Sequence, residues 1–250
     1  MRGLAGWDHA GVTAAGDPLA AADLGGWARR LVGVLRRSGR PLLVLQAACL
    51  LPAGLAAAAL ARLGWAGGLA GGLLAAAAAA LAQAGSLHLA VIEAAGRPTA
   101  VSAALAAGRG SALPLLGWSA LAAVLTGIGL ALAVLPGLYA AVVAAAALPG
   151  AVVVERAGLR RAAALVNRRP AGTAARCVAG LFAAALYGAV VGTVVAALPG
   201  PVDDVVRAVA VLPLTVVGAA FAAVTYAGLR QAADGSGVAE LAAELGSGPA

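Results

Sequence analysis

The longest charge-free stretch of the chain, Gly110 to Val154, constrains the fold most, because these 45 residues contain no Asp, Glu, Lys or Arg. A helix needs about 20 apolar residues to cross the hydrocarbon core of a bilayer. The length therefore predicts two membrane-spanning helices, and the pair Pro136–Gly137 predicts the tight turn between them. Glu155 and Arg156 follow at once and place the end of the second helix at a membrane surface.

The composition agrees with a chain that is surrounded mainly by lipid. Hydrophobic residues make up 62% of the sequence and charged residues 11%, compared with about 25% charged residues in a soluble domain. The predicted fold class is therefore all-α, a polytopic membrane protein. All 17 basic residues are arginine, and the abundance of alanine and glycine is typical of a GC-rich bacterial genome. The arginines flank apolar stretches and are not interleaved with aromatic residues, which favours anionic membrane lipid over nucleic acid as the partner.

The N-terminal part is predicted to lie outside the membrane core. Residues 1–16 form a polar leader without the layout of a signal peptide, and we expect them to be disordered. Residues 17–40 are predicted to form an amphipathic helix that begins at Asp17–Pro18 and lies in the plane of the membrane, with its arginines opposite an apolar stripe. A solvated or protein-packed helix would show the same stripe. The candidates for lipid contact here are Trp27, Arg29, Arg30, Arg36 and Arg37.

Residues 41–230 are predicted to form a transmembrane domain of six helices. Pro149–Gly150 should bend or break the fourth helix, because proline removes a backbone hydrogen bond. Gly67 and Gly71, which have GxxxG spacing, are expected to serve packing between helices. Residues 231–250 are predicted to be a flexible cytoplasmic tail. The six spans are expected within Pro41–Ala61, Leu63–Ile92, two in Ser111–Val154, Cys177–Val202 and Ala208–Leu229.

The distribution of arginines predicts the orientation of these six spans. When the connecting segments are assigned alternately to the two sides, 15 arginines lie on the side of the two termini and only Arg62 and Arg207 lie on the other. Cytoplasmic segments carry the excess of Lys and Arg in membrane proteins. We therefore expect a multi-pass protein of the inner (plasma) membrane with both termini in the cytoplasm.

The segment after the fourth span holds six arginines between Arg156 and Arg176. It predicts a second interfacial helix, Gly158 to Arg169, that ends before Pro170. Glu155 is expected to form ion pairs with Arg156, Arg97 or their neighbours. Further candidates for contact with anionic lipid are Arg160, Arg161, Arg168 and Arg169.

Polar residues at membrane depth are candidates for function by default. Gln83, Ser86 and Glu93 fall on one side of the second span and could line a polar path, whereas His88 points elsewhere. The alternative is that Gln83 and Ser86 form hydrogen bonds between helices and that Glu93 lies at the interface. His88 has no neighbouring metal ligand in the sequence and is expected to pack.

No stretch of the sequence matches a known catalytic or cofactor-binding motif. Walker, Rossmann and HExxH signatures are absent, and Cys49 and Cys177 lack the spacing of a metal site. We expect no cofactor, no metal and no catalytic residue. Ser86 and His88 face different directions on one helix, so they do not form a nucleophile–base pair.

Two segments carry a resemblance to a known family. Leu135–Leu138 and Leu148–Gly158, with Thr225–Arg230 near the end, are similar to the glycerophosphoryl diester phosphodiesterase membrane domain-like family of bacterial membrane proteins. Leu165–Val166–Asn167–Arg168 departs from the family pattern, and so does Gly228, which replaces an acid. The resemblance implies a six-helix membrane domain. It implies no phosphodiesterase activity, because the polar segments are too short to hold the catalytic domain.

The function predicted from these observations is that of a non-enzymatic integral membrane protein. It is expected to act as a membrane scaffold or partner subunit that contacts anionic lipid, with a possible membrane-protein partner. The alternative is a transporter or permease subunit, motivated by the break at Pro149–Gly150 and the polar side of the second span. A lipid-processing enzyme is a third, less favoured hypothesis.

Overall fold

The computed structural model describes residues 17–21, 23–197 and 200–246. Throughout these residues the regular structure is helical, which confirms the predicted all-α fold. The predicted disordered leader, residues 1–16, lies outside the described residues. The nine helices of the described chain are α1 Leu24–Ala61, α2 Trp65–Ala94, α3 Val101–Leu132, α4 Val134–Ala146, α5 Leu148–Val153, α6 Leu159–Arg168, α7 Pro170–Ala196, α8 Gly200–Asp234 and α9 Val238–Gly246.

Five of these helices are long and apolar enough to cross a bilayer: α1, α2, α3, α7 and α8. The apolar helix α4 is shorter, with 13 residues. Their lipid-accessible surfaces carry large apolar side chains, including Leu55, Leu69 and Phe182. The chain is therefore an all-α polytopic membrane protein.

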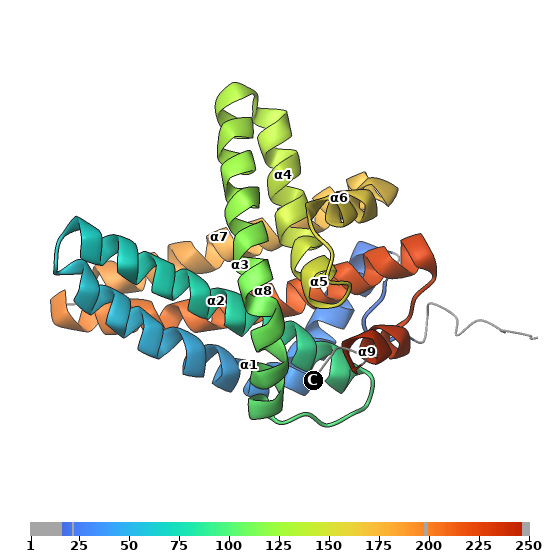
Figure 1. The fold of residues 1–250 in the computed structure, drawn as a ribbon, viewed down its shortest axis with the longest axis horizontal. Helices are drawn as coiled ribbons and strands as arrows, with labels where there is room; N and C mark the ends of the chain where they lie inside the picture. Colours follow the sequence, from blue (N-terminus) through green and yellow to red (C-terminus); the bar gives the residue numbers. More distant parts are fainter. Residues whose placement is uncertain (1–16, 22, 198–199, 247–250) are drawn as a thin grey trace, which may run out of the picture.

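The helices form two apolar arms, a first arm of α1, α2, α7 and α8 and a second arm of α3 and α4, and one end that carries both apolar and charged residues (Figure 1). Helices α1, α2, α7 and α8 run lengthwise together, and the last residues of α1 and α7 lie at the same end of this group as the first residues of α2 and α8. The hairpin of α3 and α4 rises at a large angle from this group. The short helices α5, α6 and α9 gather around the C-terminal end of α8, which carries Arg230 and Asp234.

The structure corrects the predicted boundary between an interfacial helix, 17–40, and a first span. Helix α1 is continuous from Leu24 to Ala61, with Pro41 inside it. Proline removes one backbone hydrogen bond, but Leu42 and Leu45 on the following turns are fully buried, and this packing keeps the helix intact. The predicted start at Asp17 is also wrong. Asp23 caps α1, because its carboxylate accepts the backbone N–H of Gly26 at 3.1 Å.

Glycines let neighbouring helices approach closely in the first arm. A Cβ atom added to Gly71 would lie 2.8 Å from the carbonyl oxygen of Ala57 on α1, and one added to Gly67 would meet Leu60. The expected packing role of these two glycines is confirmed. The same device joins α2 to α3, where a Cβ on Gly108 would lie 2.7 Å from the backbone nitrogen of Gly85.

The apolar stretch Gly110 to Val154 forms a helical hairpin of α3 and α4 followed by a break, but the predicted turn at Pro136–Gly137 is wrong, because both residues lie inside α4. The turn lies at Ala133, so Pro136 falls in the first turn of α4, a position that proline tolerates. The predicted break before Pro149 is confirmed as a separate short helix, α5, with Pro149 in its first turn. The predicted helix from Gly158 to Arg169 is also present, as α6.

The predicted flexible tail is wrong for most of its length. Helix α8 continues to Asp234, and α9 follows after a short turn. Leu241 and Ala242 of α9 are at most 1% exposed, so this helix packs on the rest of the protein. Glu244, one of the acids of this segment, binds Arg230 of α8. Residues 247–250 lie outside the described part.

Candidate functional site

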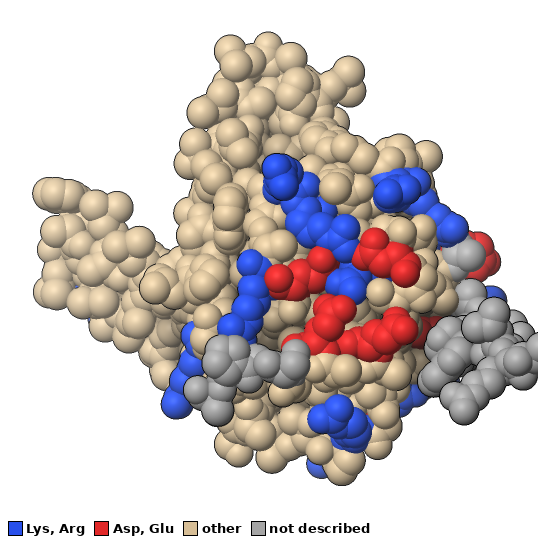
Figure 2. All heavy atoms as spheres, turned by 45° about the vertical axis from the view of Figure 1, so that its right-hand side comes forward, with Lys and Arg blue, Asp and Glu red and all other residues tan. Residues whose placement is uncertain are grey.

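The charged side chains gather on one face of the molecule, and the two apolar arms extend away from it (Figure 2). This face is the end at which α5, α6, α8 and α9 meet in Figure 1. Acidic and basic side chains alternate over it, so the acids are close enough to the arginines to pair with them. The ion pairs of the described residues are concentrated there.

Glu155 stands at the centre of a buried polar network at this end. Its Oε2 accepts the Nε–H of Arg161 at 2.6 Å, and its Oε1 accepts the Tyr226 hydroxyl at 2.7 Å. The same Oε1 lies 3.2 Å from Nη1 of Arg230. Tyr226 is fully buried and Arg230 is 5% exposed. A buried carboxylate is stabilised when it is paired and hydrogen-bonded in this way.

Arg230 connects this network to α9. Its Nη2 donates to Oε1 of Glu244 at 2.7 Å and to the Ser236 hydroxyl at 3.2 Å, and its Nη1 donates to the other Glu244 oxygen at 3.2 Å. The two-oxygen contact is the bidentate geometry that guanidinium and carboxylate favour. Arg230 Nε also lies 3.1 Å from Asp234 on the same helix. One arginine thus ties α8 to both the α5–α6 turn and α9.

A second contact holds the other end of α9. Oδ2 of Asp17 accepts the backbone N–H of Val238, the first residue of α9, at 2.9 Å. Asp17 also accepts the N–H groups of Leu19 and Ala20 through its Oδ1. The carboxylate therefore caps a helix more than 200 residues away in the sequence, where the unpaired N–H groups of a helix start favour an anion.

Arg161 is more exposed than Arg230 and bridges Glu155 and Asp234. Burial lowers the pKa of its guanidinium, but hydrogen bonds to Glu155 and Asp234 outweigh this effect and raise the pKa above its usual value. Arg161 therefore stays charged and pairs with both Glu155 and Asp234. This placement differs from the predicted role of Arg161 in lipid contact.

The predicted lipid-contact residues differ in how exposed they are. The structure corrects the prediction for Trp27, whose side chain is 5% exposed, because its Nε1 donates to the buried Thr225 hydroxyl at 3.0 Å and its ring packs edge-on against Phe221. Arg30 is half-buried. The remaining arginines of the prediction are exposed, which leaves them accessible to lipid headgroups: Arg29, Arg36, Arg37, Arg160, Arg168 and Arg169.

The three residues of the predicted polar path are not brought together as a channel. Ser86 is fully buried and its hydroxyl accepts a hydrogen bond from Nε2 of Gln46 on α1 at 3.0 Å, which is the interhelical bond of the alternative interpretation. Gln83 is half-buried. Oε2 of Glu93 is buried with no hydrogen-bond partner among the described residues. The polar path stays a prediction.

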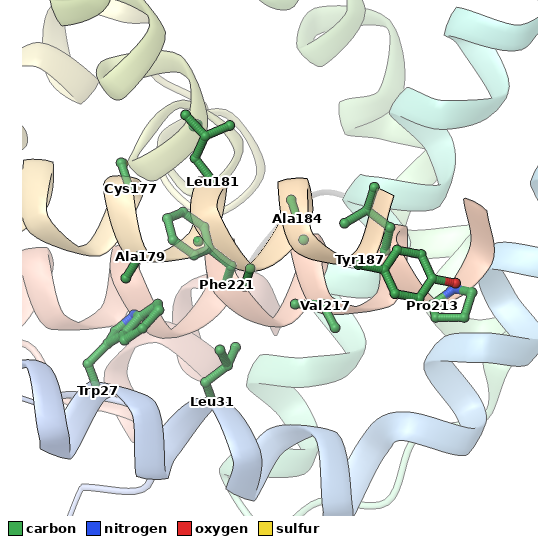
Figure 3. A pocket seen from close by; sticks show the side chains of 15 residues that line it. Trp27, Leu31, Cys177, Ala179, Leu181, Ala184, Tyr187, Pro213, Val217 and Phe221 are labelled. Carbon is green, nitrogen blue, oxygen red and sulfur yellow. The ribbon is translucent and has the colours of Figure 1, made fainter. Parts of the chain in front are cut away.

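An apolar cavity of about 490 Å³ opens between α1, α7 and α8 (Figure 3). Trp27 and Leu31 lie on one side, Cys177 to Tyr187 of α7 on another, and Pro213 to Phe221 of α8 between them. The Tyr187 hydroxyl donates to the carbonyl oxygen of Ala210 at 2.7 Å, and the Trp27 N–H is used by Thr225. The polar groups of the wall thus have partners within the protein.

Metal ligands do not gather among the residues that the structure describes: no three of their His, Cys, Asp or Glu side chains are placed to share an ion. Both cysteines are half-buried free thiols, and Cys177 lies in the wall of the apolar cavity.

Sequence reasoning missed the central residues of the network: Tyr226, Arg230 and Glu244. Arg230 was assigned only to the end of the last span, and Glu244 to a flexible tail. A signal was present in Thr225–Arg230, which carries an aromatic hydroxyl and an arginine one helical turn apart, so that both face the same neighbour. This spacing gives no indication of their distant partner, Glu155.

The fold and this site define the chain as an all-α polytopic membrane protein with a charged, ion-paired end. In the comparison with known proteins, no protein family, no curated protein and no solved structure matches the chain.

Proposed function

We propose that the chain is a non-enzymatic lipid-binding protein of a bacterial inner membrane, with six spans and both termini in the cytoplasm. Helix α4 alone is shorter than the about 20 residues of a typical span, but α4 and α5 together extend from Val134 to Val153. With this pair counted as the fourth span, the charged end falls on the side that the arginines predict as cytoplasmic.

The observation that carries the lipid-binding proposal is the apolar cavity between α1, α7 and α8. Water gains little in a cavity whose polar groups already have partners. The volume lies within the range of about 300–1,000 Å³ that is usual for ligand sites, and the walls are apolar over almost their whole surface. A lipid acyl chain is the apolar ligand that a bilayer supplies at every lipid-exposed opening. It is therefore the proposed occupant.

The direction of the cavity fits an acyl chain that enters from the headgroup region. Cys177 and Tyr187 mark its two ends on α7, and ten helical residues span about 15 Å along the axis (Figure 3). Arg29, which is exposed, and Arg30 follow Trp27 on α1, whereas Arg176 next to Cys177 is buried and donates to the carbonyl oxygen of Ala21. An anionic headgroup at that end would meet positive charge.

A diazirine-labelled fatty acid fed to cells that express the protein tests this proposal. After irradiation and purification of the full chain, mass spectrometry should place adducts on the α7 and α8 residues of the cavity wall. Ala184→Phe fills the cavity and is expected to reduce these adducts about tenfold, whereas Ala189→Phe, on the exposed side of α7 outside the cavity wall, should leave them unchanged. Equal labelling of the cavity wall in the two variants would refute the proposed site.

A membrane-protein partner is the second part of the proposal. Almost the whole apolar surface of α7 is exposed, including Leu181, Phe182 and Leu186. Such a surface suits lipid or the helix of another protein equally well, because lipid tails and apolar side chains solvate it alike. Purification in native lipid discs followed by mass spectrometry separates these outcomes. A stoichiometric protein partner would support a scaffold or subunit role, and lipid alone would count against it.

We also propose that the chain is a distant relative of the glycerophosphoryl diester phosphodiesterase membrane domain-like family. In support, the two segments that carry the resemblance touch each other. Gly150 packs under the Tyr226 ring, where a Cβ atom would lie 2.1 Å from Cγ, and Glu155 binds Tyr226 and Arg230. Structures of family members that lack this contact would oppose the relationship.

The transporter alternative rests on the polar residues of α2. Glu93, with its unpartnered carboxylate oxygen, is the residue that favours it most. Solute uptake into proteoliposomes that is abolished by Glu93→Gln would make this alternative the better one. Neither Gln83, Ser86 nor Glu93 lines the apolar cavity, so the two proposals can be tested separately.

A further inference from the structure

A second cavity, of about 520 Å³, lies between α2, α3, the α5–α6 turn and α9. Unlike the cavity between α1, α7 and α8, it has a mixed lining with four polar side chains. Each comes from a different element: His88 from α2, Ser111 from α3, Arg156 from the turn after α5, and Glu244 from α9. Four separate segments that bring polar groups to one cavity are typical of a binding site.

The charges around this second cavity do not balance within the described residues. Glu244 binds Arg230 through both carboxylate oxygens, and the neighbouring Glu155 binds Arg161 and Arg230. Arg156 is exposed, and no hydrogen bond or ion pair to another described residue engages its guanidinium. The acids are thus already used, and Arg156 is left as a cation beside the histidine and the serine hydroxyl.

The backbone at Arg156 gives a second reason to assign a role to this side chain. Its φ angle is +52°, and among the described residues it is alone in having a positive φ without being glycine. The following N–H, of Ala157, fixes the turn by donating to the carbonyl oxygen of Ala151 at 2.9 Å. A residue with a Cβ atom pays about 1–2 kcal/mol for this conformation, and glycine would adopt it freely. Strain of this kind is found where a side chain is needed in a particular place.

We propose that this second cavity binds a phosphate-type anion, with Arg156 as its principal ligand. A planar guanidinium pairs with phosphate oxygens through two parallel hydrogen bonds, and the Ser111 hydroxyl and a ring N–H of His88 supply further donors. The cavity opens at the charged end, beside α9 and the α5–α6 turn, which the proposed topology puts at the level of the lipid headgroups. The anion is therefore either the phosphate of a phospholipid headgroup or a free phosphate compound.

The test compares phosphate binding by three variants of the full chain in lipid discs. Arg156→Gln removes the charge, and Arg156→Gly removes the side chain while relieving the backbone strain, so that it folds at least as well as the wild type. Arg62→Gln is the matched control, because Arg62 is an exposed arginine that neither lines this cavity nor belongs to the predicted lipid-contact residues. Binding of radiolabelled inorganic phosphate is measured by equilibrium dialysis in phosphatidylcholine discs, and retention of phosphatidic acid is measured by native mass spectrometry.

Both Arg156 variants are expected to lose at least about tenfold in affinity, which corresponds to one charge-assisted contact, and Arg62→Gln is expected to match the wild type. Saturable binding of inorganic phosphate assigns a free phosphate compound to the cavity. Selective retention of phosphatidic acid without phosphate binding assigns a lipid headgroup. Wild-type binding of both probes by Arg156→Gly would overturn the proposal. Ala184→Phe should leave this site unchanged, so a failure of the acyl-chain proposal remains distinguishable.

Discussion

Replacement of Arg230 by glutamine should loosen the whole charged end, and the structure gives the expected size of the effect. The Arg230 side chain is 6% exposed and its partner Glu155 is 15% exposed, whereas Asp234 and Glu244 are 34% and 39% exposed. Removing one partner from a buried ion pair costs about 3–5 kcal/mol, but a solvent-exposed pair contributes only about 0–1 kcal/mol. Arg230→Gln is therefore expected to lower the free energy of unfolding by about 3 kcal/mol, mainly through Glu155.

Arg161→Gln is the matched control, because Arg161 binds the same Glu155 but is itself 32% exposed. It should cost about 1 kcal/mol or less. Unfolding of both variants can be followed by SDS titration in mixed micelles with tryptophan fluorescence. A double-mutant cycle with Glu155→Gln should yield a coupling energy of about 1–3 kcal/mol for Arg230. Equal destabilisation by the two arginine variants would refute the view that burial decides the strength of these pairs.

The Arg230→Gln variant also tests the attachment of α9. Arg230 contacts both Ser236 and Glu244, so its loss should raise the hydrogen exchange of the α9 amides toward that of a detached helix. Arg161→Gln should leave this exchange unchanged, since Arg161 forms its hydrogen bonds with Glu155 and Asp234, which lie outside α9. Protection of α9 at the wild-type level in Arg230→Gln would show that the apolar contacts of Leu241 and the cap by Asp17 are sufficient to hold this helix.

Three further predictions concern packing and charge. Gly150→Ala places a Cβ 2.1 Å from the Tyr226 ring and should lower the free energy of unfolding by about 1–3 kcal/mol in the same titration. Gly72→Ala, which has open space around it, should be neutral or should stabilise by up to about 1 kcal/mol. A Gly150→Ala variant as stable as the wild type would contradict the close contact. Trp27→Phe leaves the buried Thr225 hydroxyl without its donor and should cost about 1–3 kcal/mol, and Thr225→Val in the same background should recover part of it. Because the pKa of Arg161 is raised in the folded state, its stabilisation is present at every pH below the unfolded value, so the difference between wild type and Arg161→Gln should stay constant from about pH 6 to 9; a difference that changes in this range would show that another group titrates.

The apolar helices could be predicted from the sequence because lipid imposes a simple requirement on length and charge. The end of α1 at Ala61, both ends of α2 and the end of α5 at Val153 agree with the predicted spans within a few residues. The starts of α1 and α3 do not, because both helices begin at least ten residues before the predicted spans. The break before Pro149 was predictable for a similar reason, since proline acts on its own backbone. Local rules sufficed wherever the cause was local.

Predictions failed where a distant partner decides the structure. Trp27 has the spacing of a membrane anchor, but Phe221 and Thr225 of α8 bury it. The acids after Asp234 have the composition of a flexible tail, but Arg230 and Asp17 hold α9 in place. A helical wheel shows which residues share a face and does not show what that face meets. Pairings over such sequence distances require the fold.

The capping of α9 by Asp17 also bears on the order in which the protein can fold. Val238 emerges from the ribosome more than 200 residues after Asp17, and Glu244 emerges later still. Until then the carboxylate of Asp17 has no helix to cap, and Arg230 lacks its bidentate partner. The charged end therefore closes as the last step, after the apolar helices have been synthesised, and it can close only around a chain whose first and last described segments have reached the same side of the membrane.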